Sequence, residues 1–109
     1  MTNTYKPLGQ SNPAATTATT LYTVPAATSA IVSTLAICNQ AGTPATFRVA
    51  IRPAGAALAA QHYIAYDTPL NQNDTVFLTL GVTLGATDVV TVYASSGTVS
   101  FSAFGCEIS

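Results

Sequence analysis

Charged side chains are scarce in this sequence. Asp, Glu, Lys and Arg make up 6% of its 109 residues, whereas an ordinary soluble domain has about 25%. The uncharged runs are broken every few residues by Thr, Ser, Asn, Gly or Pro, so none supplies the roughly 20 mostly apolar residues that cross a bilayer. Disorder is also disfavoured, because 49% of the residues are hydrophobic and the formal net charge is only -1. We therefore expect one folded domain that does not cross a membrane.

Positive charge is especially limited, since Lys and Arg together number three. Nucleic-acid binding requires clustered cations against phosphates, so we expect no nucleic-acid partner. The segment MTNTYKPLGQ has no apolar stretch typical of a secretory signal, which predicts synthesis in the cytoplasm. In that reducing setting Cys38 and Cys106 are expected to stay free thiols and to behave as small buried apolar residues. They form no CxxC pair, so no zinc site is expected.

Groups that could perform catalysis are few. His62 and Asp67 stand five residues apart in one expected strand, so they point to opposite faces of the sheet and do not form a dyad. Asp74 and Asp88 stand in the turn-like stretches NQND and GATD, where Asp commonly accepts backbone hydrogen bonds. The sequence has no GxSxG elbow and no glycine-rich phosphate loop. It therefore predicts a protein that is not an enzyme and holds no metal or cofactor.

What the sequence does contain is a repeated β-strand pattern. Short alternating segments are separated by Gly, Pro, Asn and Asp at intervals of roughly ten residues. In ATFRVAIR, Phe47, Val49 and Ile51 face one way, toward the expected core, while the intervening residues face outward. The pattern predicts an all-β fold over residues 21–109, an antiparallel β-sandwich or jelly roll of about seven to eight strands.

The segment AIVSTLAICN is expected to be a central strand, because both of its faces are mostly apolar or small. Simple alternation places Ile31 and Leu35 on one face and Val32 on the other. Gly81 is expected to mark a bend or bulge, and Gly105 to shift the register of the last strand.

Residues 1–20 show neither a strand nor a helix period and contain Pro7, Gly9 and Pro13. They are expected to form an extended N-terminal arm outside the sandwich. Tyr5 and Leu8 are its large apolar residues, and such an arm could lie along a neighbouring subunit by β-strand addition. The alternative is a frayed tail.

Arg48 and Arg52 lie four residues apart on the outward face of one expected strand. One interpretation is that each covers neighbouring Thr and Ala surface and pairs with Asp67 or Glu107 on an adjacent strand. The other is a subunit contact, because Arg is enriched at protein interfaces.

Tyr63 and Tyr66 have two interpretations as well. Tyrosine often forms the wet edge of a core, with its ring buried and its hydroxyl at the surface. The same rings could instead offer stacking faces to a sugar or to a partner protein.

With the strands placed, one long stretch resembles a known module. TTLYTVPAATSAIVSTLAICNQAGTPATFRVAIRPAG, residues 19–55, is similar to a small β-sandwich module of structural proteins of tailed bacteriophages, in which an LYTVPA turn precedes a strand ending in CN and a strand carrying FRVA. YIAYD, LTLGVTLGATDVVTVYAS and SFSAFGCEI match later parts of the same pattern. The resemblance covers about residues 8–109.

The resemblance implies a non-enzymatic virion protein located on the particle exterior. It is expected to be a tail fibre or baseplate accessory that contacts other virion structural proteins as a homo-oligomer, with a trimer as the implied form. Two alternatives stay open, a capsid decoration protein and a module that binds host surface glycans. The contact residues expected for these roles are Tyr5, Leu8, Arg48, Arg52, Tyr63 and Tyr66.

Overall fold

The computed structural model describes residues 2–109, so residue 1 of the expected arm lies outside it. It contains eight β-strands and two short 3-10 turns. In chain order these are β1 (Asn3–Ser11), β2 (Thr19–Thr23), β3 (Ser29–Asn39), β4 (Ala45–Arg52), η1 (Pro53–Gly55), η2 (Ala60–His62), β5 (Tyr63–Leu70), β6 (Thr75–Leu84), β7 (Val89–Ala94) and β8 (Val99–Ile108). Within residues 2–109 no helix is long and apolar enough to span a membrane.

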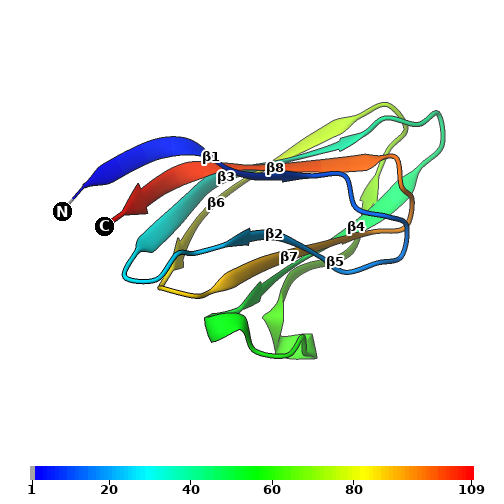
Figure 1. Cartoon of the computed structure of the whole chain (residues 1–109). Coiled ribbons are helices and arrows are strands. Elements are labelled where there is room, and N and C mark those ends of the chain that lie inside the picture. Colours follow the sequence, from blue (N-terminus) through cyan, green and yellow to red (C-terminus); the bar gives the residue numbers. More distant parts are fainter. Residues whose placement is uncertain (1) are drawn as a thin grey trace.

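The strands form two four-stranded sheets that lie one above the other (Figure 1). Sheet A has the order β1-β8-β3-β6 and sheet B the order β2-β7-β4-β5. All neighbouring strands are antiparallel. The pairs β1 with β8, β2 with β7, β3 with β6 and β4 with β5 arise when one long hairpin is rolled over on itself, which is the jelly-roll topology. The expected all-β sandwich or jelly roll is confirmed.

The core lies between the two sheets and is built from the inward faces of the strands. In β4, Phe47 and Val49 are fully buried, and Ile51 packs against the same cluster, as the alternation predicted. Phe47 of sheet B meets Phe101 of sheet A edge to face, with the ring centroids 6.5 Å apart. This geometry suits the quadrupoles of the two rings and ties the layers together.

The N-terminal segment is part of sheet A, which corrects the expectation of an arm outside the sandwich. β1 is extended, but it pairs with β8 along its whole length, and Leu8 packs against this chain's own core. Pro7 and Gly9 hid the strand in the sequence, and the sheet tolerates them because β1 is an edge strand with a register shift between these two residues. Thr2 and Ser109 exchange two backbone hydrogen bonds, so both ends of the described chain lie side by side (Figure 1).

A β-bulge at Ser33 changes which residues of β3 face the core. The pairing of β3 with both β6 and β8 shifts at this residue, and the Ser33 hydroxyl donates a hydrogen bond to the Phe104 carbonyl at 3.1 Å. Leu35 is buried as expected, but Val32 is also buried and Ile31 is exposed. Simple alternation placed Ile31 with Leu35, and the extra residue of the bulge is the reason this was wrong.

The two expected irregularities at glycine both lie at the level of this bulge. Gly81 has φ +60, in the left-handed region, and sits where the register between β3 and β6 shifts. Gly105 lies opposite Val32, where the register between β3 and β8 shifts. A Cβ at Gly105 would overlap the carbonyl oxygen of Ile31, so the close approach of the two backbones requires glycine. Both expectations are confirmed.

Candidate functional site

The outer face of sheet A exposes large apolar side chains from all four of its strands. Tyr5 of β1 is 78% exposed, Phe77 of β6 is 66% exposed, and Ile31 of β3 and Phe104 of β8 are each 37% exposed. Isolated exposed apolar residues are normal, but a contiguous group of them indicates an interaction surface. Tyr5, Ile31 and Phe104 line one hollow together, and Phe77 lies farther along the sheet, opposite Ala36. We call these four residues and the sheet surface between them the apolar face.

A hollow of about 520 Å³ lies in the β1 half of the apolar face. Its lining is almost wholly apolar and includes Tyr5, Pro7, Ile31 and Phe104. Lys6 also lines it, but the Lys6 ammonium nitrogen lies 2.9 Å from a carboxylate oxygen of Glu107. The hollow is therefore suited to receive an apolar group of a partner.

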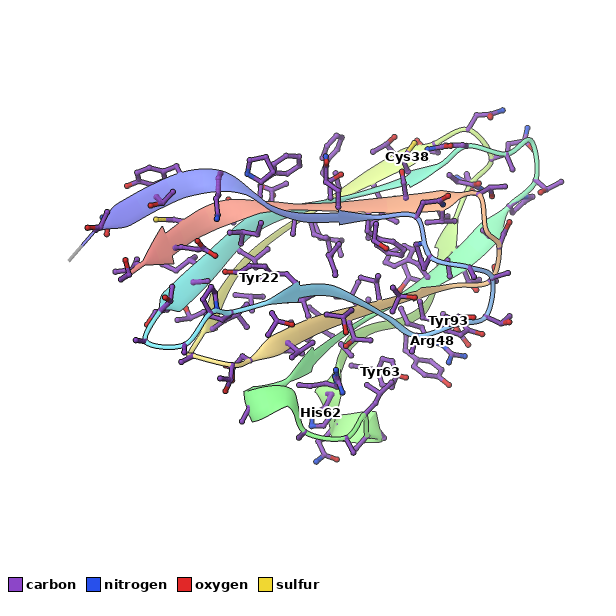
Figure 2. The ribbon with its side chains drawn as sticks, in the orientation of Figure 1. Tyr22, Cys38, Arg48, His62, Tyr63 and Tyr93 are labelled. Carbon is purple, nitrogen blue, oxygen red and sulfur yellow. The ribbon has the colours of Figure 1, made fainter. Side chains whose placement is uncertain are left out.

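Cys38 and Cys106 are free thiols in sheet A. Both are half-buried, rather than buried in the core as the sequence suggested. Cys106 lies opposite Tyr5 on one side and opposite Ile31 on the other, so it lies between these two residues of the apolar face. Cys38 projects from the same sheet (Figure 2).

A second group of side chains lies on the opposite side of the molecule, on sheet B (Figure 2). The Arg48 guanidinium carbon lies 4.2 Å from the ring centroid of Tyr66 and 4.2 Å from that of Tyr93. Arg48 Nε and Nη2 donate hydrogen bonds to the two carboxylate oxygens of Asp67, at 2.6 and 3.3 Å. The Tyr63 ring meets Tyr66 edge to face, with centroids 4.9 Å apart. We call these five residues the tyrosine cluster.

The electrostatics of the tyrosine cluster favour rigidity over chemistry. The hydrogen bond to Asp67 raises the pKa of Arg48 above its ordinary value, so this side chain stays cationic. The carboxylate neutralises that charge, and cation-π contacts hold the two flanking rings in place. Asp67 has a positive φ of 48, a conformation that non-glycine residues seldom adopt, and lies where the register between β4 and β5 shifts.

The tyrosine cluster borders an open hollow of about 650 Å³. Tyr66 is 58% exposed at its edge. The arrangement offers fixed aromatic surface beside a neutral ion pair, which can hold a flat apolar or hydroxyl-bearing group. The residues that line the hollow are Leu58, Ala59, Ala60, Tyr63 and Tyr66.

Arg52 lies apart from the tyrosine cluster and is engaged within its own chain. Its Nε donates to the Thr91 hydroxyl at 3.0 Å, and its Nη1 donates to the Ala56 carbonyl at 3.1 Å. One of the interpretations left open, pairing with Asp67 or Glu107, therefore holds for Arg48, which pairs with Asp67, whereas Arg52 bonds to neutral groups. Of the six candidate contact residues, Arg48, Tyr63 and Tyr66 lie together in the tyrosine cluster. Tyr5 lies on the outer face of the other sheet. Leu8 and Arg52 contact residues of their own chain.

The residues considered for catalysis have structural partners. His62 is the last residue of η2 and precedes β5, so the expectation that it shares a strand with Asp67 is wrong. It is buried, and its Nδ1 accepts a hydrogen bond from the Ala59 amide at 3.1 Å. Asp88 accepts from the amides of Ala54 and Gly85, each at 2.8 Å. Asp74 accepts from the Thr75 amide at 2.8 Å. The predicted role of both aspartates as turn residues is confirmed.

A polar network between the sheets was missed by sequence reasoning. Glu107 of β8 receives a 2.5 Å hydrogen bond from the Tyr22 hydroxyl of β2 and forms the 2.9 Å ion pair with Lys6 of β1. The pKa of Glu107 lies below its ordinary value, mainly because of the hydrogen bond from Tyr22 and secondly because of the Lys6 ammonium. The pKa of Tyr22 is raised mainly by burial and secondly by the hydrogen bond to Glu107, so the Tyr22 hydroxyl stays protonated. Figure 2 shows Tyr22 between the two layers.

Asn39 is the second polar residue that the sequence did not single out. It is 1% exposed, and its Nδ2 donates to the Thr43 carbonyl at 2.8 Å and to the Asn71 carbonyl at 3.3 Å. Its Oδ1 accepts from the Ala41 amide and from the Thr98 hydroxyl, each at 3.1 Å. Asn39 therefore fastens three loops at one end of the roll, a structural role that explains an amide at the end of β3.

Comparison with protein-family models, with curated proteins and with solved structures gave no match for this chain. The similarity of residues 19–55 to phage structural modules therefore stays a prediction from the sequence.

Proposed function

We propose that the chain is a non-enzymatic structural protein of a tailed bacteriophage virion, assembled on the outside of the particle as a tail fibre or baseplate accessory. The observation that carries the assembly role is the apolar face, on which four strands expose large apolar side chains. Docking of such a face removes apolar surface from water and desolvates little charge. Its partners are other virion structural proteins.

The phage setting rests on the resemblance of residues 19–55 and is consistent with the fold. Two-sheet jelly rolls occur in viral capsid proteins and lectins, among others. A fold alone does not establish a function, so the assignment needs a direct test on particles.

The test replaces Tyr5, the most exposed residue of the apolar face, with lysine. Tyr5→Lys places a charge in the contact and removes an aromatic anchor, so incorporation into particles should fall roughly tenfold or more. Ile64→Lys is the matched control, because Ile64 is 48% exposed on sheet B. Incorporation is measured by immunoblotting of purified particles after complementation of a deletion. Equal incorporation of both variants would contradict the role of the apolar face.

The place on the particle is tested by imaging particles that lack the protein. Intact heads with altered tails would support the proposed tail location. Weakened heads would instead support the alternative of a capsid decoration protein.

The open hollow beside the tyrosine cluster favours a second candidate function, binding of host surface glycans. Exposed aromatic rings held by a neutral ion pair suit stacking against sugar rings. A glycan array probed with the purified protein tests it. Binding that disappears in Tyr66→Ala and persists in Tyr5→Ala would support this function, and an array without signal would remove it.

A further inference from the structure

The β6 edge of sheet A differs from the other three edges of the sandwich. An edge strand presents unpaired N–H and C=O groups, and proteins usually protect such edges with charge, proline, bulges or short length. β1 carries Lys6 and Pro7, β2 has five residues, and β5 carries Asp67 and Pro69. β6, TVFLTLGVTL, has ten residues and neither a charge nor a proline.

The side chains of β6 are also incompletely covered. Val76, Leu78 and Val82 pack against the core but are only half-buried, whereas inward residues of the central strands, such as Leu35 and Phe101, are at most 1% exposed. One more strand beside β6 would cover them. The bulge at Gly81 leaves the first half of β6, from Thr75 to Thr79, in regular pairing with β3.

We propose that β6 pairs antiparallel with the β6 of a second copy of this chain, joining two copies of sheet A into one continuous eight-stranded sheet. In such a two-fold contact each strand faces itself, so a strand with charges of one sign would repel its copy. β6 has no charge, and the whole chain has a formal net charge of only -1. A second copy is therefore the partner that its chemistry fits.

The contact closes on itself. Both β6 edges are used up in the pairing, and the remaining edges of the joined sheet are the two β1 strands, which Lys6 and Pro7 protect. The result is a dimer rather than a filament. With the two-fold axis near Phe77, the exposed Phe77 rings of the two copies meet across the seam.

This inference deepens the proposed function and rests on it for its biological meaning, since it names the edge through which copies join. The joined sheet would present two apolar faces on one side, doubling the surface available to a virion partner. The isologous dimer also differs from the trimer that the resemblance implied.

The experiment measures the mass of the purified full chain in solution by light scattering and sedimentation over micromolar to millimolar concentrations. The expected mass is about twice the 11.1 kDa of the chain. Phe77→Lys and, independently, Thr79→Lys should yield folded monomers, because each places two lysines at the seam. Tyr5→Lys on β1 and Ile64→Lys on β5 are matched controls and should remain dimers. Hydrogen exchange of the β6 amides should slow as the wild-type chain dimerises.

Several results would overturn the proposal. One is that the wild-type chain is monomeric or trimeric at all concentrations. Another is that both β6 variants remain dimers. Thermal melts establish folding, and Thr79→Lys decides if Phe77→Lys does not fold. The β6 pairing and the virion function can fail independently of each other. A chain that is monomeric but still incorporates into particles contradicts only the β6 pairing. A chain that dimerises but does not incorporate contradicts only the virion function.

Discussion

The Glu107 side chain links its own strand, β8, to β1 in the same sheet and to β2 in the other sheet. Its carboxylate accepts the Tyr22 hydroxyl and pairs with Lys6, and these partners lower its pKa below the ordinary 4.5. A carboxyl group whose pKa is lower in the folded state stabilises that state above its unfolded pKa. This contribution is lost as the pH falls through the folded pKa. The fold should therefore lose the Glu107 contribution at acid pH below about 4.5.

Glu107→Gln tests this pH dependence. At pH 7 the variant should melt about 5 °C below the wild type, because it loses the charged acceptor. Toward pH 3 the unfolded chain takes up a proton at this carboxyl group more readily than the folded chain does, so the difference should shrink. Thermal melts at both pH values measure the effect, and Tyr22→Phe should reproduce part of it. A difference that is equal at pH 7 and pH 3 would show that Glu107 acts through its shape and not through its charge.

Asn39 and Glu107 also show why polar partners are hard to read from sequence. Asp67 was one of two partners considered for Arg48, and the two residues do pair, on strands that are consecutive in the chain. The partners of Glu107 are separated from it by 85 residues or more, and only the rolled topology brings them together. No local pattern marks such a contact.

Among the elements, β8 depends on glycine at one position. Gly105 passes so close to β3 that a Cβ would overlap the Ile31 carbonyl oxygen and lie 2.9 Å from the carbonyl carbon. Gly105→Ala should lower the free energy of unfolding by about 2 kcal/mol, since backbone rather than a flexible side chain must move. Gly42→Ala is the matched control, because a Cβ there meets nothing within 4 Å. Urea unfolding compares the two variants, and equal stability would contradict the proposed overlap.

The strands themselves were predictable to different degrees. β4 follows a strict alternation from Ala45 to Val49 and was placed with the correct buried face. β3 was located correctly, but the bulge at Ser33 reversed the face of Ile31, and a bulge leaves little trace in one sequence. β1 was taken for an arm, because Pro7 and Gly9 break the strand pattern. Its pairing with β8 depends on contacts between the two ends of the chain.

The two candidate surfaces were also predictable from the sequence to different degrees. Tyr63, Tyr66 and Arg48 were singled out from their own strands and do lie together. The apolar face was not foreseen beyond Tyr5, because its members come from four strands far apart in sequence. A surface built from several strands can be predicted only if the order of the strands in the sheet is known. Composition and periodicity do not provide that order.

For the whole molecule, β1 closes one side of the roll. Gly9 approaches so near to β2 that a Cβ there would overlap the Leu21 carbonyl oxygen, so the edges of the two sheets meet at this side. β1 also supplies Leu8 to the core and Lys6 to the ion pair with Glu107. An arm outside the sandwich would be dispensable for folding, whereas this strand should not be.

Deletion of residues 1–11 tests these opposing expectations. Loss of β1 uncovers the β8 edge, removes Leu8 from the core and leaves Glu107 without its cation. The truncated chain should melt about 10 °C or more below the full chain and should aggregate through the newly open edge. Deletion of residues 1–2, which leaves β1 whole, is the control. Thermal melts and size-exclusion chromatography measure both effects, and a truncated chain as stable and soluble as the control would restore the arm as a separate element.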